Sequence, residues 1–343
     1  IVRPIFVAIL SAVRLQRNNQ RVYDIIGDIH GYADELVRLL ESLGYRSANG
    51  VYRHPQRRVV FCGDFIDRGP QIRETLTIAR AMVQDDAALA VMGNHEFNAL
   101  AYHTAVPGQG GEFLRRHTDR NRAQHHQTIE QLNAAELASF LDWMRSLPVW
   151  LDLGTIRIVH ACWSAHDFAV ITQAAEQTGL MSEQFLVQAT QVGHALFESI
   201  ERVLKGPEME LPDGHVVVDK EGFQRRRIRT RWFVDPTDHT LGTYALPARH
   251  EEELRQAPLP TGLAGNSYPA NAPPVFFGHY WLSAPQPQTL APNVACLDFS
   301  VAKGGHLCAY RWDGEQILRA DHFVTVPSRN TDADSQQQVE LRL

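Results

Sequence analysis

The sequence predicts an α/β fold in which strands alternate with helices and ligand-binding side chains gather at one edge of a sheet. Two observations support this class. Five short apolar runs have the composition of buried strands, and each ends in a glycine, a polar side chain, or both. Helical spacing of apolar residues then follows the first two runs. The runs are residues 22–26, 59–62, 88–92, 156–159 and 275–277.

The segments between these runs predict the remaining elements. Apolar residues recur every three or four positions over residues 33–43 and 72–83, which predicts two helices that cross over the sheet. Longer helices are predicted over residues 127–147 and 182–205, each followed by a proline that cannot continue it. Residues 294–314 predict antiparallel strands.

Polar side chains that can bind a metal follow all five predicted strands. Buried strands of an open α/β fold present such residues at a common edge, where these folds bind ligands. Carboxylate, amide and neutral imidazole groups suit Mn, Fe, Zn or Mg, and the absence of a thiolate pair argues against a structural zinc site. The candidate ligands are Asp28, His30, Asp64, Asn94, His160 and His279.

The central position of Asp64 among these strand ends makes it the candidate bridge between two ions. Two catalytic ions lie about 3.5–4 Å apart and share such a bridging ligand. Asp28 and His30 could then hold one ion, and the remaining candidates the other. A single Asn-His or Asp-x-His block is typical of a turn or a helix cap, so the prediction depends on the blocks occurring together.

Three residues next to the candidate ligands predict acid catalysis and phosphate binding. His95 directly follows Asn94, and an imidazole kept protonated by a carboxylate is a suitable general acid near neutral pH. Asp67 is the candidate partner of that imidazole. Arg68 offers a planar, permanently charged fork of donors for two phosphate oxygens.

These blocks resemble those of the calcineurin-like metallophosphoesterases. The motif Asp67-Arg68-Gly69 is similar to the branch that contains the Ser/Thr phosphoprotein phosphatases and the bacterial diadenosine tetraphosphatases. The resemblance implies a four-layer α/β/β/α sandwich with a mainly helical insert. It implies two divalent metal ions, with Mn favoured and Fe, Zn, Ni or Mg as alternatives.

The resemblance also implies a role for each site residue. Asp28, His30 and Asp64 would bind the first metal, and Asp64, Asn94, His160 and His279 the second. His95 would be the general acid, oriented by Asp67, and Arg68 would bind the substrate phosphate.

The substrate is less closely predicted than the chemistry. The protein phosphatases that the chain resembles usually carry a pair of small residues after the ligand that corresponds to His160, whereas this chain has Ala161-Cys162-Trp163. Trp163 could wall the cleft or stack on a flat leaving group. Arg229 and Arg231 alternate as in a strand and are further candidate substrate contacts. A small phosphorylated metabolite or dinucleoside polyphosphate is therefore the first substrate hypothesis. The alternatives are a Ser/Thr protein phosphatase and a non-catalytic phosphate-binding module.

The polar segment with His117, His125 and His126 predicts a solvated loop. Arg115, Arg116 and Arg122 in the same segment are weaker candidates for reading the non-reacting part of a substrate.

Composition sets limits on partners and location. The 343 residues are 44% hydrophobic and 21% charged, which suffices for a large core. A net charge of −6 predicts no nucleic-acid binding, and residues 1–15 are too short an apolar stretch to span a membrane. The oligomeric state is not predicted. Cysteines without metal or redox spacing favour a cytoplasmic protein; they are Cys62, Cys162, Cys296 and Cys308.

The predicted domain organisation has three parts. Residues 1–20 form an N-terminal extension, residues 21–325 a metallophosphoesterase domain, and residues 326–343 a polar, disordered tail. The long interval between the ligands His160 and His279 predicts an insert or cap over about residues 164–274.

Overall fold

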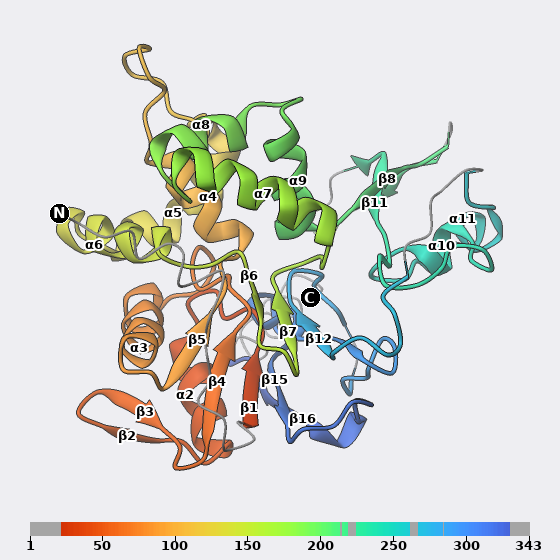
Figure 1. The fold of residues 1–343 in the computed structure, drawn as a ribbon, viewed down its shortest axis with the longest axis horizontal. Helices are drawn as coiled ribbons and strands as arrows, with labels where there is room; N and C mark the ends of the chain where they lie inside the picture. The colour runs from red at the N-terminus through yellow and green to blue at the C-terminus, as the bar shows by residue number, and fades with distance from the viewer. Residues whose placement is uncertain (1–21, 213–214, 219–223, 261–266, 284, 330–343) are drawn as a thin grey trace, which may run out of the picture.

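Two sheets pack face to face at the centre of the molecule (Figure 1). The computed structural model describes residues 22–212, 215–218, 224–260, 267–283 and 285–329. The larger sheet has the order β14-β15-β1-β4-β5, with β16 paired to β15. Its strands are β1 (Val22–Ile26), β4 (Arg57–Phe61), β5 (Ala88–Ala90), β14 (Asp298–Phe299), β15 (His306–Trp312) and β16 (Phe323–Pro327).

The second sheet has four strands in the order β13-β12-β7-β6. They are β6 (Trp150–Asp152), β7 (Arg157–Val159), β12 (Val275–Phe277) and β13 (Val294–Cys296). The strands that precede candidate ligands run parallel to their neighbours in both sheets: β1 with β4, β4 with β5, and β7 with β12. Their carboxyl ends therefore meet at a common edge, as the sequence predicts.

Alternating side chains of the strands serve two separate cores. Ile25 and Phe276, one from each sheet, belong to a buried cluster between the sheets, where Phe276 contacts Tyr310 at a ring distance of 5.1 Å. The neighbours Ile26 and Phe277 belong to the other large cluster, which includes the helices. This period of two explains why the strands are almost continuously apolar, since both faces of each sheet are covered.

Helices α2 (Ala33–Ser42) and α3 (Ile72–Gln84) lie beside the larger sheet (Figure 1) and match the two predicted crossover helices. Another group of helices gathers beyond the strand ends, in the upper half of Figure 1. It comprises α4 (Asn94–Tyr102), α5 (Asp119–Gln131), α6 (Ala134–Arg145), α7 (Ala165–Thr178), α8 (Glu183–Thr190) and α9 (Ala195–Lys205). The predicted α/β class with sandwiched sheets is confirmed.

Small elements complete the described chain. Three two-stranded sheets pair β2 (Arg46–Ala48) with β3 (Val51–Arg53), β8 (Glu208–Glu210) with β11 (Arg227–Arg229), and β9 (Val217–Val218) with β10 (Gln224–Arg225). Short helices are α10 (Leu241–Tyr244), α11 (Glu252–Gln256), η1 (Val301–Lys303) and η2 (Ala320–His322). The predicted N-terminal extension and most of the predicted tail lie outside the described residues.

The helix predicted over residues 127–147 is wrong as a single element. The first helix ends at Gln131. Asn133 caps the second helix, because its side-chain oxygen accepts hydrogen bonds from the amides of Ala135 and Glu136 at 3.0 Å. The Asn133 amide in turn donates a hydrogen bond to Glu136 Oε2 at 2.9 Å, which completes a capping box.

The helix predicted over residues 182–205 is also divided. Gly193 adopts a φ of +84°, which a continuing helix excludes, and the side chain of His194 caps α9 by accepting from the Leu196 amide. Val192 lies in this break and is 80% exposed.

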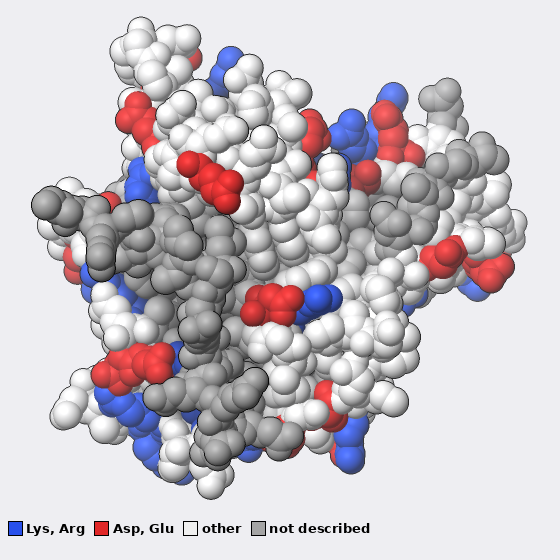
Figure 2. All heavy atoms as spheres, in the orientation of Figure 1, with Lys and Arg blue, Asp and Glu red and all other residues white. Residues whose placement is uncertain are grey.

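Acidic and basic side chains are interspersed on the face shown in Figure 2. Within the described ranges, every helix is too short or too polar to cross a bilayer.

Candidate active site

Six predicted ligand residues converge at the carboxyl ends of five strands. Asp28 and His30 follow β1, Asp64 follows β4, Asn94 begins α4 after β5, His160 follows β7 and His279 follows β12. All six are buried. Residues up to 251 positions apart in the chain are in contact here, since the His279 amide donates to Asp28 Oδ2 at 3.0 Å.

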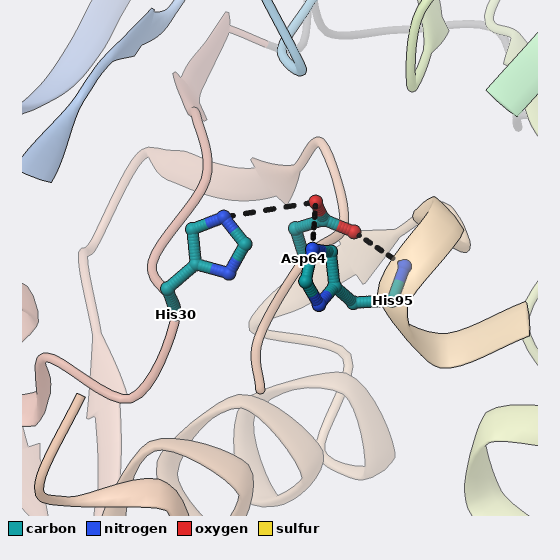
Figure 3. A group of neighbouring side chains, drawn as sticks. All are labelled: His30, Asp64 and His95. Atoms are coloured by element: carbon teal, nitrogen blue, oxygen red, sulfur yellow. Dashed lines mark hydrogen bonds and ion pairs between the residues drawn. The ribbon is translucent and has the colours of Figure 1, made fainter. Parts of the chain in front are cut away.

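Asp64 lies at the centre of this group, as Figure 3 shows for its contacts with His30 and His95. Its Oδ2 is 3.7 Å from His30 Nε2 and 3.4 Å from His160 Nε2, while its Oδ1 accepts from the His95 amide at 2.9 Å. One carboxylate oxygen therefore faces a histidine of each predicted ligand set. This is the position that a bridging ligand requires.

Three buried side-chain atoms around Asp64 have no hydrogen-bond partner among the described residues. They are Asp28 Oδ1, His30 Nε2 and His279 Nε2. The other ring nitrogen of His30 contacts the Ile66 carbonyl oxygen at 2.9 Å; if Nδ1 carries the proton, Nε2 is free to bind a cation. Burial raises the pKa of Asp28 well above its ordinary value, and the nearby Asp298 charge adds to this. A bound cation would compensate both effects.

A second set of candidate metal ligands lies on the other side of Asp64. Asn94 Oδ1 is 2.6 Å from His279 Nδ1 and 3.1 Å from His160 Nε2. His160 Nδ1 contacts the Cys62 carbonyl oxygen at 2.7 Å, which orients its Nε2 toward Asp64. Burial lowers the pKa of His160, but the Asp64 carboxylate outweighs burial and raises it to about 10. The donors on both sides are hard oxygens and imidazole nitrogens, and they fit two divalent cations.

Local backbone geometry holds these side chains in place. His30, Asp64 and His279 have φ values of +52°, +54° and +72°, a region that L-residues rarely adopt. At Gly278 a Cβ atom would overlap Asp28 Oδ1, so a glycine is required before His279. The loops are thus shaped to aim side chains inward at a cost in local strain.

His95 and Asp67 form the predicted pair. His95 Nδ1 lies 2.6 Å from Asp67 Oδ2, and its Nε2 faces Asp64 at 3.9 Å. Burial lowers the pKa of His95, but the Asp64 and Asp67 carboxylates outweigh burial and raise the pKa above the ordinary value of a histidine. If a cation took up the charge of Asp64, the Asp67 carboxylate would still raise the pKa of His95.

Arg68 lies beside the indole ring of Trp281. Its guanidinium carbon is 4.9 Å from the centre of the Trp281 indole, which in turn lies 6.3 Å from the His30 ring. Lys303 Nζ lies 5.6 Å from the same indole. Two positively charged side chains, Arg68 and Lys303, therefore lie around one indole at the edge of the candidate metal centre.

The three predicted substrate contacts differ in position. Trp163 packs edge-on against Phe168 at 4.8 Å and under the Arg157 guanidinium at 4.8 Å. Arg229 lies close enough to the centre that its charge, after burial, contributes to lowering the pKa of His279. The guanidinium of Arg231 donates to the Leu290 carbonyl oxygen at 3.4 Å and lies over the Phe233 ring.

One further residue, Glu96, supports the site without having been predicted to do so. Glu96 is fully buried and accepts from the amides of Asp64 and Phe65 at 2.8 Å, which fixes the loop that carries the central carboxylate. Burial, together with the Asp64 charge, raises the pKa of Glu96 to about 7. The sequence feature that could have predicted this role is the position of Glu96 in the Gly93-Asn94-His95-Glu96 block.

The solvated loop predicted around His125 is wrong for that residue. His125 lies in α5, is 4% exposed, and contacts Asp67 Oδ1 through its Nδ1 at 2.6 Å. Its neighbour His126 is exposed and pairs with Glu130, as a solvated position would. Arg115 is directed inward to Asn98 and Gln124.

Comparison with known proteins agrees with this geometry. The model of the calcineurin-like phosphoesterases matches residues 23–204. The asymmetrical bis(5'-nucleosyl)-tetraphosphatase of Anoxybacillus flavithermus is 45% identical over 143 residues, which are 41% of this chain and 57% of that protein. The symmetrical enzyme of that name from Methylococcus capsulatus is 33% identical over 145 residues, 41% of this chain and 44% of that protein. The chain thus spans about half the length of these curated relatives.

Among solved structures, the cold-active protein-tyrosine phosphatase of a psychrophilic Shewanella has a TM-score of 0.49 at 16% identity. The match covers 91% of this chain and 81% of that one. Because the family model covers more than half of the chain, the protein belongs to the calcineurin-like phosphoesterase family.

Proposed function

We propose that this chain is a divalent-metal-dependent phosphoesterase that hydrolyses phosphate esters or anhydrides by a two-metal mechanism. The observation that carries the proposal is the position of Asp64 Oδ2, between His30 Nε2 and His160 Nε2. Asp28, His30 and Asp64 would hold one cation, and Asp64, Asn94, His160 and His279 the other. When bound, the two cations supply positive charge for the phosphate oxygens and lower the pKa of the attacking water.

The other site residues bind the phosphate and move a proton. The Arg68 guanidinium donates to two phosphate oxygens and stabilises their charge as the transferred group flattens. His95 carries a proton on Nε2, since Nδ1 is engaged with Asp67, and delivers it to the departing oxygen. Asp67 keeps the imidazolium charged and fixes its ring.

Mn is the proposed metal, with Fe, Zn, Ni and Mg as alternatives. Carboxylate, amide and imidazole donors without a thiolate suit all of these ions, and availability decides among them. The four cysteines are unpaired and buried, which supports the proposed cytoplasmic location. The division into residues 21–325 and an insert over about 164–274 also remains a proposal.

The proposed substrate is a small phosphorylated metabolite or, more specifically, a dinucleoside polyphosphate. Both relatives are named bis(5'-nucleosyl)-tetraphosphatases, which supports this proposal. Arg68 and Lys303 around the Trp281 indole place two positive charges beside the centre, which favours a substrate with more than one phosphate. Trp163, Arg229 and Arg231 remain proposed contacts to the rest of that substrate.

A Ser/Thr protein phosphatase is the second candidate function, since Asp67-Arg68-Gly69 resembles that branch as well. A non-catalytic phosphate-binding module is the third. The buried His95–Asp67 pair counts against a binding module, because binding alone requires no proton donor aligned with the centre.

A hydrolysis panel with Mn separates these functions. The substrates are p-nitrophenyl phosphate, its bis ester, diadenosine tetraphosphate and a phosphothreonine peptide, each with and without a chelator. We expect chelator-sensitive turnover with the highest kcat/KM for diadenosine tetraphosphate. Turnover of the peptide alone would establish the protein phosphatase instead, and binding without any turnover would establish the binding module.

Lys303→Met tests the polyphosphate preference. The side chain is exposed, so its loss removes a charge without opening the core. We expect kcat/KM for diadenosine tetraphosphate to fall about fivefold to tenfold, or ~1 kcal/mol, and kcat/KM for p-nitrophenyl phosphate to change less than about twofold. Lys303→Arg, which keeps the charge, should retain both values. An equal change for the two substrates would refute the preference.

A further inference from the structure

Three donors surround the carboxylate of Asp67. His95 Nδ1 lies 2.6 Å from Oδ2, while His125 Nδ1 and Thr128 Oγ1 each lie 2.6 Å from Oδ1. All four side chains are buried. Only the His95 contact follows from the motifs at the strand ends; the other two come from α5, where His125 and Thr128 are three residues apart and therefore share a face.

The contact is the main buried attachment of α5. His125 and Thr128 are the buried residues of this helix, whose other positions are largely polar and accessible. Burying an imidazole and a hydroxyl is unfavourable unless both are hydrogen-bonded. Asp67 satisfies both at once, so the placement of α5 and the orientation of one carboxylate are linked.

We propose that His125 is a positioning residue for the hydrolytic reaction, which fixes the Asp67 carboxylate through Nδ1 and thereby aims His95 at the leaving-group oxygen. The inference rests on the proposed function, since it assigns the residue that orients the acid of that same site. Two donors on Oδ1 hold the carboxylate against rotation about its Cβ–Cγ bond, which leaves Oδ2 directed at His95.

The electrostatics of Asp67 are consistent with this role. Burial raises the pKa of the carboxyl, but the hydrogen bonds from His125 and His95 outweigh burial and hold the pKa below its usual range. An ionised Asp67 accepts from both rings. Without His125, burial would act on a carboxylate with one fewer donor.

The far side of the His125 ring is also held. His125 Nε2 lies 3.0 Å from His103 Nε2, and the Tyr102 ring is 5.1 Å away. Burial, with the His125 charge nearby, lowers the pKa of His103 to about 4, so His103 is neutral at neutral pH. A ring flip of His125 would break the contacts with both Asp67 and His103. The ring is thus fixed in the one orientation that serves Asp67.

The test compares His125→Leu with His125→Asn and with His126→Leu. Leu removes the donor, Asn returns an N–H near the position of Nδ1, and His126 is an exposed neighbour on the same helix. For each Mn-loaded variant, kcat and KM are measured for p-nitrophenyl phosphate, whose leaving group needs little protonation, and phenyl phosphate, whose leaving group needs more.

We expect His125→Leu to lower kcat for phenyl phosphate about 10-fold to 100-fold, with a loss under about threefold for p-nitrophenyl phosphate and KM within about twofold. His125→Asn should recover most of the loss, and His126→Leu should match the wild type. Thr128→Val, which removes the second donor without changing side-chain volume, should give a smaller loss of the same selectivity, and it provides the test if His125→Leu does not fold.

Equal losses for both esters, or no loss in either His125→Leu or Thr128→Val, would overturn the role of His125 while leaving the proposed function intact. A wild-type chain that hydrolyses neither these two esters nor diadenosine tetraphosphate with Mn would instead overturn the proposed function, and the assignment of His125 with it.

Discussion

Asp64→Asn is expected to lower kcat/KM by on the order of a thousandfold or more. The substitution keeps the shape of the side chain but removes the charge that faces both His30 and His160. A neutral amide is a poor bridge between two divalent cations, so at least one site should lose its metal. Activity is measured with p-nitrophenyl phosphate over a Mn titration, and bound metal by elemental analysis of the dialysed chain.

Asp142→Asn is the matched control, because Asp142 is an exposed carboxylate on α6. It should retain wild-type metal content and rate. If Asp64→Asn bound as much Mn and turned over as fast as this control, Asp64 would not be the bridge.

His95→Ala is expected to lower kcat by about 10²–10⁴-fold for esters with poor leaving groups. The variant loses the proton donor that Asp67 orients at 2.6 Å, while all six candidate metal ligands remain. The loss should be smaller for p-nitrophenyl phosphate, whose leaving group departs without a proton. Rates for a series of aryl phosphates therefore measure the role directly, as the slope of log kcat against leaving-group pKa.

The slope should be steeper in His95→Ala than in the wild type, and Mn content should be unchanged. A variant with an unaltered slope but less bound Mn would assign His95 to the metal centre instead. That alternative has a structural basis, since His95 Nε2 lies 3.9 Å from Asp64 Oδ2.

The strands and the six candidate ligands were predictable because their signals are local. An apolar run of three to five residues followed by a glycine or histidine identifies both a buried strand and the side chain at its end. Gly278, before His279, is an example: no larger residue fits beside Asp28, so the glycine itself indicates that the chain passes close to another part of the site there. Parallel pairing then brings these ends to one edge without further information.

The helix breaks were predictable in principle. Asn133 and Glu136 have the spacing of a capping box, and Gly193 precedes the cap of α9, but the continuous apolar periodicity of both segments concealed these signals. Periodicity describes which face of a helix is buried, whereas capping residues determine where a helix begins.

The contacts of His125 and Trp281 were not predictable in the same way. His125 meets Asp67 across 58 positions of the sequence, and its own segment is polar, which is typical of a solvated stretch. Trp281 reaches Arg68 and Lys303 only because of the turn after His279, where Trp281 has a φ of +52°. Such contacts depend on how whole elements pack.

The two-metal proposal is tested most directly by the hydrolysis rate of the metal-stripped chain as Mn is added back, with p-nitrophenyl phosphate as substrate. We predict no turnover in chelator and a saturable recovery that ends with two Mn ions bound per chain. Full turnover in chelator, or full turnover with no bound metal, would contradict the account.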